Sequence, residues 1–231
     1  MKLVSFVGFS DSGKTTVVEQ VAIELKKRGY QVGVIKHCPH GFDLDKKDSD
    51  SHRMWAAGAE GVGVVSSDQV AIYKRTSAPQ KLRSVAELNF PHYDFVLIEG
   101  GKDEPGLPKI EVWRKELSPK LITARGELVA VVSDDQPETD RPVFNFCQLE
   151  DLVDFLEKNE KLNLPATHLW VDDRLVPLKP FVQEMLEGSV LGMVKTLKKI
   201  PAKPRWLSLF IALQKEKNPK EAGKKPAEHS E

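Results

Sequence analysis

The sequence predicts an α/β protein, a three-layer sandwich whose mainly parallel sheet is covered by helices on both faces. Continuous apolar runs of strand length alternate along the chain with segments whose apolar residues recur at helical spacing. Strands that are apolar throughout are typical of parallel sheets, which are buried on both faces. Strands are predicted at 3–7, 31–35, 61–66, 94–98 and 128–132, and helices at 14–28, 50–57 and 149–158.

The most specific motif is a glycine-rich loop with the pattern G-x-x-x-x-G-K-[ST], which spans residues 8–15. It follows the first predicted strand and precedes the first predicted helix, as a phosphate-binding loop requires, and it places the domain in the P-loop NTPase fold. Its glycines let the backbone approach a polyphosphate, while the N–H groups at the helix start point at it. Lys14 is expected to reach the β- and γ-phosphates, and the Thr15 hydroxyl to ligate Mg²⁺. The residues expected to contact the nucleotide here are Gly8, Ser10, Asp11, Ser12, Gly13, Lys14, Thr15 and Thr16.

A second group of candidate residues follows the second predicted strand, where an α/β sheet binds its ligands. Lys36-His37-Cys38-Pro39-His40 stands there, and Lys36 and His37 are candidates for contacts with the nucleotide. Acidic residues come next, and Asp45 among them is a candidate for catalysis and for holding Mg²⁺, directly or through water. Metal ligation by the histidines and Cys38 is the weaker hypothesis, because the spacing lacks a matching second half. The acidic residues of this segment are Asp43, Asp45, Asp48 and Asp50.

The strand predicted at 94–98 ends in a carboxylate, Glu99, which resembles a Walker B arrangement. Glu99 is expected to hold a Mg²⁺-bound water or to orient an attacking one, which makes it a candidate catalytic and metal residue. Lys102 follows closely and is a further candidate for nucleotide contact. The alternative is that Glu99 is a surface residue that only ends the strand.

Two shorter runs, 69–74 and 110–113, alternate apolar and polar residues near turn signals. This pattern predicts an antiparallel ribbon added to the main sheet. An unpaired ribbon edge commonly joins a second subunit, so we expect a homodimer through these two runs.

The chain changes character after Pro165. Short strands are predicted at 168–171 and 174–176, followed by an apolar helix from Pro180, so residues 166–200 are expected to form a small α+β appendage. It could contact a partner or extend a dimer. Residues 214–231 consist largely of Lys, Glu, Pro and Ala and predict a disordered charged tail. The nucleotide-binding domain is therefore predicted to span residues 1–160.

The composition argues against several functional classes. The 34 Lys and Arg residues balance 34 Asp and Glu residues, so no overall charge favours nucleic acid or a membrane surface. Cys38 and Cys147 lie far apart, which is consistent with a reducing compartment. With neither a signal-peptide pattern nor a long apolar span, a cytoplasmic location without membrane insertion is expected.

Taken in order, the motifs resemble one family, the molybdopterin-guanine dinucleotide biosynthesis protein B, or MobB. The resemblance covers residues 1–160, and it implies a GTP-binding P-loop protein with weak intrinsic hydrolysis and a Mg²⁺ cofactor. It further implies an intertwined homodimer that works beside the guanylyltransferase MobA, which joins GMP to the molybdopterin cofactor. The matching segments are GFSDSGKTT at 8–16, KHCPH at 36–40, the aspartate run 45–51 leading to Arg53 and AGA at 57–59, LIEG at 97–100 with Lys102, and PKIE at 108–111.

The chain departs from that family pattern at Asp48 and Ser49, where a Gly-Lys pair is expected, so a phosphate contact by that lysine is not available. The Asn-Lys-x-Asp motif that reads guanine in many GTPases is also missing. Ser133-Asp134-Asp135 could instead place a carboxylate against the guanine N1 and N2 hydrogens, or could be a polar turn after a strand.

A competing function is a P-loop kinase or an ATP-dependent ligase of a small metabolite. In that case Lys36, His37 and Lys102 would hold an acceptor substrate. Arg53 is the best arginine within the motifs to stabilise charge during hydrolysis, and weak hydrolysis is expected because its position is not convincing.

Overall fold

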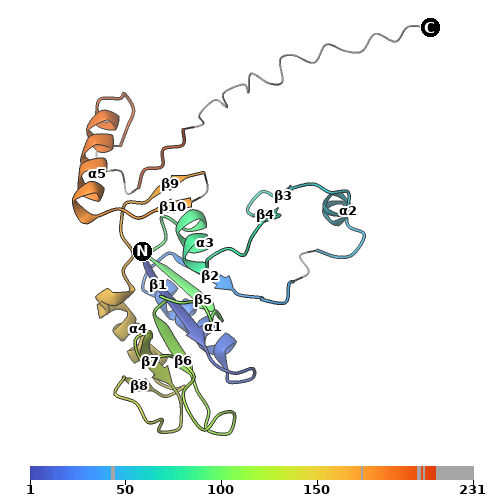
Figure 1. Ribbon diagram of the computed structural model, residues 1–231, viewed down its shortest axis with the longest axis vertical. Coiled ribbons are helices and arrows are strands. Elements are labelled where there is room, and N and C mark those ends of the chain that lie inside the picture. Colours follow the sequence, from blue (N-terminus) through green and yellow to red (C-terminus); the bar gives the residue numbers. More distant parts are fainter. Residues whose placement is uncertain (43–44, 173, 202–203, 205, 212–231) are drawn as a thin grey trace.

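A computed structural model describes residues 1–42, 45–172, 174–201, 204 and 206–211 of the chain (Figure 1). Most elements of the first 160 residues belong to one sheet domain, and the elements after residue 165 form a separate extension. The predicted tail at 214–231 lies outside the described residues, as does Asp43. The elements are β1 (Lys2–Val7), α1 (Lys14–Lys27), β2 (Val32–Lys36), α2 (Asp50–Ala56), β3 (Gly61–Val65), β4 (Val70–Lys74), α3 (Leu82–Asn89), β5 (Phe95–Glu99), β6 (Lys109–Val112), β7 (Leu128–Val132), β8 (Val143–Phe144), α4 (Leu149–Lys158), the 3₁₀ turn Glu160–Leu162, β9 (Leu169–Val171), β10 (Arg174–Val176) and α5 (Pro180–Lys195).

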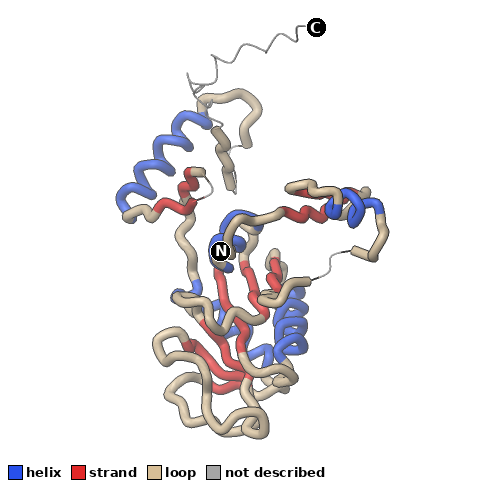
Figure 2. The backbone as a smooth tube through the Cα atoms, turned by 45° about the vertical axis from the view of Figure 1, so that its right-hand side comes forward, coloured by secondary structure: helices blue, strands red, loops and turns tan. Residues whose placement is uncertain are grey.

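The main sheet has six strands in the order β2-β5-β1-β6-β7-β8, and every neighbouring pair is parallel. Helices lie on both sides of it, which gives the predicted three-layer sandwich (Figure 2). Because all strands run the same way, their carboxyl ends meet at one edge, where the loops after β1, β2, β5, β6, β7 and β8 begin.

Alternating side chains of the strands divide the core into two layers. Val4 and Phe6 of β1 pack with the buried residues of α1 and α4 on one face, whereas Leu3 faces Leu82 and Ala86 of α3 on the other. This period of two follows from the pleat of a strand. The apolar faces of the helices therefore pack against the apolar side chains on each face of the sheet.

Lys2 closes the domain at its amino end. Its Nζ donates to the carbonyl oxygens of Leu156, Glu157 and Asn159 at 2.6–3.0 Å, at the end of α4. Burial lowers the pKa of Lys2, an effect that Glu160 and Glu157 oppose. A cation at this position satisfies carbonyl groups that have no partner within the helix and favours the negative end of its dipole.

Two strand assignments made from the sequence are wrong. The run 110–113, predicted as part of an antiparallel ribbon, lies in β6, which pairs in parallel with β1 and β7 in the centre of the sheet. The run 61–66, predicted as a strand of the main sheet, forms β3 and pairs antiparallel with β4 in a separate hairpin. The predicted ribbon at 69–74 is thus half of a hairpin whose partner is β3.

The hairpin and α2 form a lobe that stands away from the sheet (Figure 1). Within this lobe Val62 of β3 is buried. The guanidinium of Arg75 lies 4.1 Å from the centre of the Trp55 ring and donates to the Trp55 and Ala59 carbonyls. The outward side chains of both strands remain apolar and exposed, with Val65 73% and Ile72 64% exposed.

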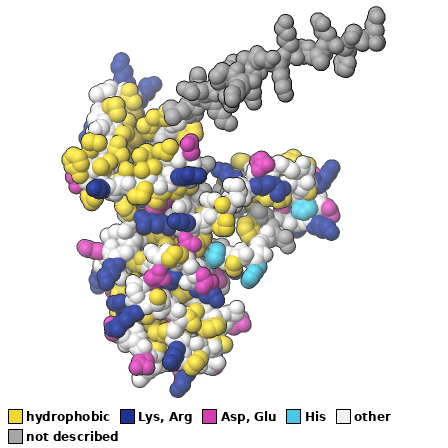
Figure 3. Space-filling view, viewed as in Figure 1, with side chains coloured by type: hydrophobic (Ala, Val, Ile, Leu, Met, Phe, Trp, Pro, Cys, Tyr) yellow, Lys and Arg dark blue, Asp and Glu magenta, His cyan; other side chains and the backbone are white. Residues whose placement is uncertain are grey.

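The extension after residue 165 contains the hairpin β9–β10 and the helix α5, as the sequence predicts. Pro180 occupies the first turn of α5, where a missing N–H costs nothing. Apolar side chains gather on its surface in Figure 3, and Phe181 of α5 is 72% exposed. Within the described ranges, no helix combines the length and apolar character needed to cross a bilayer.

Ile110→Ala tests the revised position of β6. Ile110 is fully buried between β1 and β7, so the substitution should lower the free energy of unfolding by about 2–5 kcal/mol. Urea denaturation followed by circular dichroism measures the change. Ile23→Ala is the control, because Ile23 is 49% exposed on α1 and should alter stability by less than about 1 kcal/mol. Equal effects of the two variants would contradict the central position of β6.

Candidate nucleotide-binding site

The glycine-rich loop joins β1 to α1 at the carboxyl edge of the sheet, as predicted. Gly8 and Gly13 both have positive φ angles, 147° and 96°, and Gly13 is the residue that precedes the first turn of α1. A Cβ on Gly8 would collide with the carbonyl oxygen of Val112 in β6. Glycine is therefore required here both by the backbone conformation and by the neighbouring strand.

Lys14 turns back over the loop, and its Nζ donates to the carbonyl oxygen of Phe9. Burial lowers the pKa of Lys14, while the carboxylates of Glu99 and Asp11 act in the opposite direction. An anion seated on the loop would favour the charged form in the same way. The Ser12 hydroxyl is buried in the same loop and has no hydrogen-bond partner among the described residues.

The end of β5 lies beside the start of α1. The Thr15 hydroxyl donates to Oε1 of Glu99 at 2.8 Å, and Nζ of Lys36, at the end of β2, is 3.9 Å from the same oxygen. A hydroxyl and a carboxylate are oxygen ligands of the kind Mg²⁺ prefers. The structure thus brings together three of the predicted residues, from three different elements.

Other predicted residues are only loosely connected to this group. The backbone N–H of His37 donates to the Glu99 carbonyl at 2.9 Å, so His37 is placed at the same edge by its main chain. Lys102 follows β5 with an exposed side chain, and its carbonyl accepts a hydrogen bond from Lys109. Cys38 is a half-buried free thiol, and the described residues contain no cluster of three or more His, Cys, Asp or Glu side chains suited to a metal ion.

Asp45 is not brought to Thr15 and Glu99. Its carboxylate accepts hydrogen bonds from the Ser51 hydroxyl and the Lys46 N–H, just before α2 in the lobe that stands away from the sheet (Figure 1). Hydrogen bonds, from Ser51 first and then Ser49, hold the pKa of Asp45 below its ordinary value. In this arrangement Asp45 organises the start of α2.

Arg114 and Phe146 adjoin the loop, although the sequence analysis selected neither. Nε of Arg114, just after β6, donates to the Ser12 carbonyl at 3.2 Å, and its guanidinium lies 4.4 Å from the centre of the Phe146 ring. Arg53, the arginine that the sequence favoured, is exposed on α2 and lies 3.9 Å from Asp50. The sequence signal for Arg114 is its position just after a strand of the main sheet, at the edge where ligands bind. It was missed because this strand, β6, was assigned to an antiparallel ribbon.

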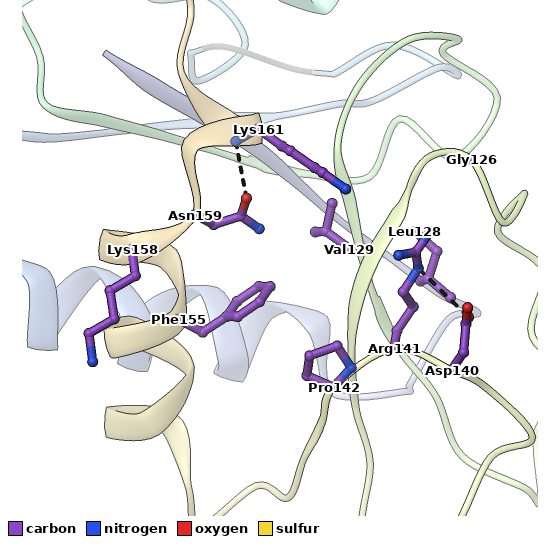
Figure 4. A pocket seen from close by; sticks show the side chains of 10 residues that line it. All are labelled: Gly126, Leu128, Val129, Asp140, Arg141, Pro142, Phe155, Lys158, Asn159 and Lys161. Carbon is purple, nitrogen blue, oxygen red and sulfur yellow. Dashed lines mark hydrogen bonds and ion pairs between the residues drawn. The ribbon is translucent and has the colours of Figure 1, made fainter.

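Two surface pockets lie away from the glycine-rich loop. One, of about 390 Å³, contains Leu128 and Val129 at the amino end of β7, with Phe155 and Lys158 of α4 and Arg141 around it (Figure 4). A second pocket lies between α1 and the edge strand β2. Ligands of parallel sheets bind at the carboxyl ends of the strands, so the pocket in Figure 4 is at the wrong end for phosphate binding.

The fold and the loop together define an α/β protein of the P-loop NTPase class. The family model of molybdopterin guanine dinucleotide synthesis protein B matches residues 3–134, more than half of the chain. The chain therefore belongs to the MobB family.

Individual relatives agree with this assignment. The molybdopterin-guanine dinucleotide biosynthesis adapter protein of Haemophilus influenzae is 35% identical over 156 residues, which cover 67% of this chain and 87% of that protein. A putative adapter protein of Methanocaldococcus jannaschii is 24% identical over 249 aligned residues, covering 93% of this chain and 99% of the relative. A crystal structure of molybdopterin-guanine biosynthesis protein B aligns with a TM-score of 0.56 and 27% identity, over 67% of this chain and 97% of that one.

Lys14→Ala tests whether this loop is the nucleotide site. Removing the ammonium group should raise the dissociation constant of a nucleoside triphosphate about 10- to 100-fold, because a charge-assisted contact is lost. The fold should be unaffected, since the hydrogen bond of the ammonium group goes to the Phe9 carbonyl of the same loop. Titration calorimetry measures the affinity, with Lys26→Ala, an exposed lysine of α1, as the control. Equal affinities of wild type and Lys14→Ala would show that nucleotide binds elsewhere.

Proposed function

We propose that the protein is a GTP-binding accessory protein in molybdenum cofactor biosynthesis, which assists the attachment of GMP to molybdopterin. Membership of the MobB family supports the pathway, and its relatives carry the name adapter protein. The observation that carries the proposal is the glycine-rich loop between β1 and α1 with Thr15 bonded to Glu99. A guanylyltransferase of the MobA kind is the proposed partner, and the cytoplasm is the proposed location.

Thr15 and Glu99 are the residues we propose to hold Mg²⁺. Their oxygens lie 2.8 Å apart, at the end of the loop that would hold the β- and γ-phosphates. Bound there, the ion would neutralise phosphate charge. Lys14, Lys36, His37 and Lys102 are proposed to contact the nucleotide from the same edge. Asp45 is proposed as a further ligand only for an arrangement in which the segment before α2 approaches Glu99.

Intrinsic hydrolysis is proposed to be weak, with Glu99 as the residue that orients the attacking water. Arg53 lies on α2 and is 74% exposed, so it gives no support to fast hydrolysis. Arg114 donates a hydrogen bond from Nε to the backbone carbonyl of Ser12 in the glycine-rich loop. An arginine that stabilises transferred phosphate is worth roughly 10³–10⁵ in rate when present.

A homodimer is also part of the proposal, with the β3–β4 hairpin as its contact. Val112 and Trp113, expected at this interface from the sequence, are buried in the sheet domain and unavailable. Val65 and Ile72 of the hairpin are exposed instead. A two-stranded hairpin with exposed apolar side chains is only marginally stable in water, which favours its pairing with a second copy.

The chain is proposed to divide into a nucleotide-binding unit, residues 1–160, and an appended unit, residues 166–200. The similarity to the Haemophilus influenzae protein spans two thirds of this chain, whereas the Methanocaldococcus jannaschii relative covers nearly all of it. The appended unit is thus proposed to be a feature shared with only some relatives.

Thermal melting with nucleotides tests the proposed ligand. GTP with Mg²⁺ should raise the melting temperature more than ATP with Mg²⁺, because the nucleotide that binds the folded state more tightly stabilises it more. Ligand at a hundred times its dissociation constant adds about 2.7 kcal/mol. Omitting Mg²⁺ should reduce the GTP shift. A shift with ATP as large as with GTP would refute the guanine preference and favour a kinase or ligase.

Ile72→Asp tests the hairpin interface. A charge on this exposed strand position should convert a dimer into a monomer, because an unpaired carboxylate would be buried at the contact. Sedimentation velocity measures the assembly state. Ile23→Asp, at a comparably exposed apolar position on α1, is the control and should remain dimeric. A monomeric wild type, or a dimeric Ile72→Asp variant, would rule out this interface.

A further inference from the structure

The loops after β7 and β8 meet at the same edge of the sheet as the glycine-rich loop. β6, β7 and β8 are consecutive neighbours, so their carboxyl ends are adjacent. The backbone N–H of Phe146, after β8, donates to Oδ1 of Asp134, after β7, at 3.2 Å. The two loops are thus joined to each other by a side chain of the first.

Arg114 and Phe146 join these two loops to the glycine-rich loop. Arg114 binds the Ser12 carbonyl through Nε and stacks on Phe146 at the same time. The edge of the Phe146 ring also lies close to Gly13, since a Cβ built on Gly13 would be 3.2 Å from it. A nucleotide with its phosphates on the glycine-rich loop would therefore have these loops next to it, on the side of β7 and β8.

The two aspartates after β7 are both exposed, and each is tied to a different loop through one carboxylate oxygen. Oδ2 of Asp135 accepts the Lys115 N–H at 2.9 Å, and the Asp135 N–H donates to the Ser133 hydroxyl, so Asp135 joins its loop to the one after β6. Asp134 is tied instead to the loop of Phe146, the residue stacked on Arg114, and its Oδ2 has no hydrogen-bond partner among the described residues. A carboxylate has about four lone-pair sites, and the bond to Phe146 uses one of them.

We propose that Asp134 reads the base of the bound nucleotide, accepting hydrogen bonds from N1–H and the 2-amino group of guanine. Arg114 and Phe146 form the wall beside the base, because a planar guanidinium and an aromatic ring both stack on nucleobases. This inference rests on the proposed function, in which the phosphates lie on the glycine-rich loop. It names the residue that selects guanine in a chain without an Asn-Lys-x-Asp motif.

The chemistry of Asp134 predicts a specific order of ligands. Adenine has an acceptor at N1 and no 2-amino group, so it offers the carboxylate no donor pair. Hypoxanthine keeps N1–H but lacks the 2-amino group, and xanthine has a carbonyl oxygen in its place. GTP should therefore bind the wild type more tightly than ATP, by roughly 10- to 100-fold for the loss of the two-bond contact. GTP should also bind more tightly than ITP and XTP, which keep only the N1–H donor.

The decisive variant is Asp134→Asn. An asparagine keeps an oxygen for the Phe146 N–H and presents an amide N–H to the base, which suits the 2-carbonyl of xanthine instead of the amine of guanine. GTP affinity should fall and XTP affinity rise, so that the GTP to XTP preference drops about 100-fold or more relative to wild type. Competition against a fluorescent nucleotide measures both affinities, and Asp135→Asn is the matched control with unchanged preference.

The outcomes separate the inference from the proposed function. If no nucleotide binds the wild type, or Lys14→Ala binds as well as wild type, the proposed function fails. If the wild type binds GTP but Asp134→Asn keeps the wild-type preference, or Asp135→Asn switches it, the inference about Asp134 is overturned while the function stands. Should Asp134→Asn not fold, the wild-type comparison of GTP with ITP decides instead, and equal affinities would overturn the inference.

Discussion

The contact between Gly8 and β6 is the constraint on which the rest of the site depends. The glycine-rich loop lies directly against the carbonyl of Val112, a distance that no residue with a Cβ allows. Because the loop is held against β6, the residue two positions further, Arg114, reaches the Ser12 carbonyl. Arg114 in turn contacts Phe146, so the close approach of the loop to β6 links the loop to this stacked pair.

On the other side of β1 the loop depends on β5. Thr15 of α1 and Glu99 of β5 meet at 2.8 Å because β1 lies beside β5 in parallel, with Phe6 opposite Glu99. β6 and β5 thus flank the loop from two sides, and each supplies a different chemistry. The β5 side offers oxygen ligands for a cation, while the β6 side offers a cation and an aromatic ring. A bound nucleotide extending across β1 would meet both.

The parts of the site that are local in sequence could be predicted, and the parts that depend on strand order could not. The glycine-rich loop follows one buried apolar strand and Glu99 ends another, and both occur where expected. β6 was misread because Lys109 and Glu111 alternate with apolar residues, as in an exposed edge strand. Both charged residues are buried and paired. Nζ of Lys109 lies 2.7 Å from Oε2 of Glu127, and the carboxylate of Glu111 accepts hydrogen bonds from the N–H groups of Ile122 and Thr123.

When buried charged residues are paired with partners distant in sequence, the sequence of a buried strand resembles that of an exposed one. A lone charged residue at a core position costs too much free energy to persist, so a partner must come from elsewhere in the fold. In β6 the partners lie in the connection from β6 to β7, at Ile122, Thr123 and Glu127, which have no recognisable motif. The same connection covers Trp113 and fixes the end of β6 from which Arg114 projects toward the glycine-rich loop. The placement of Arg114 therefore depends on pairings that only the folded chain makes visible.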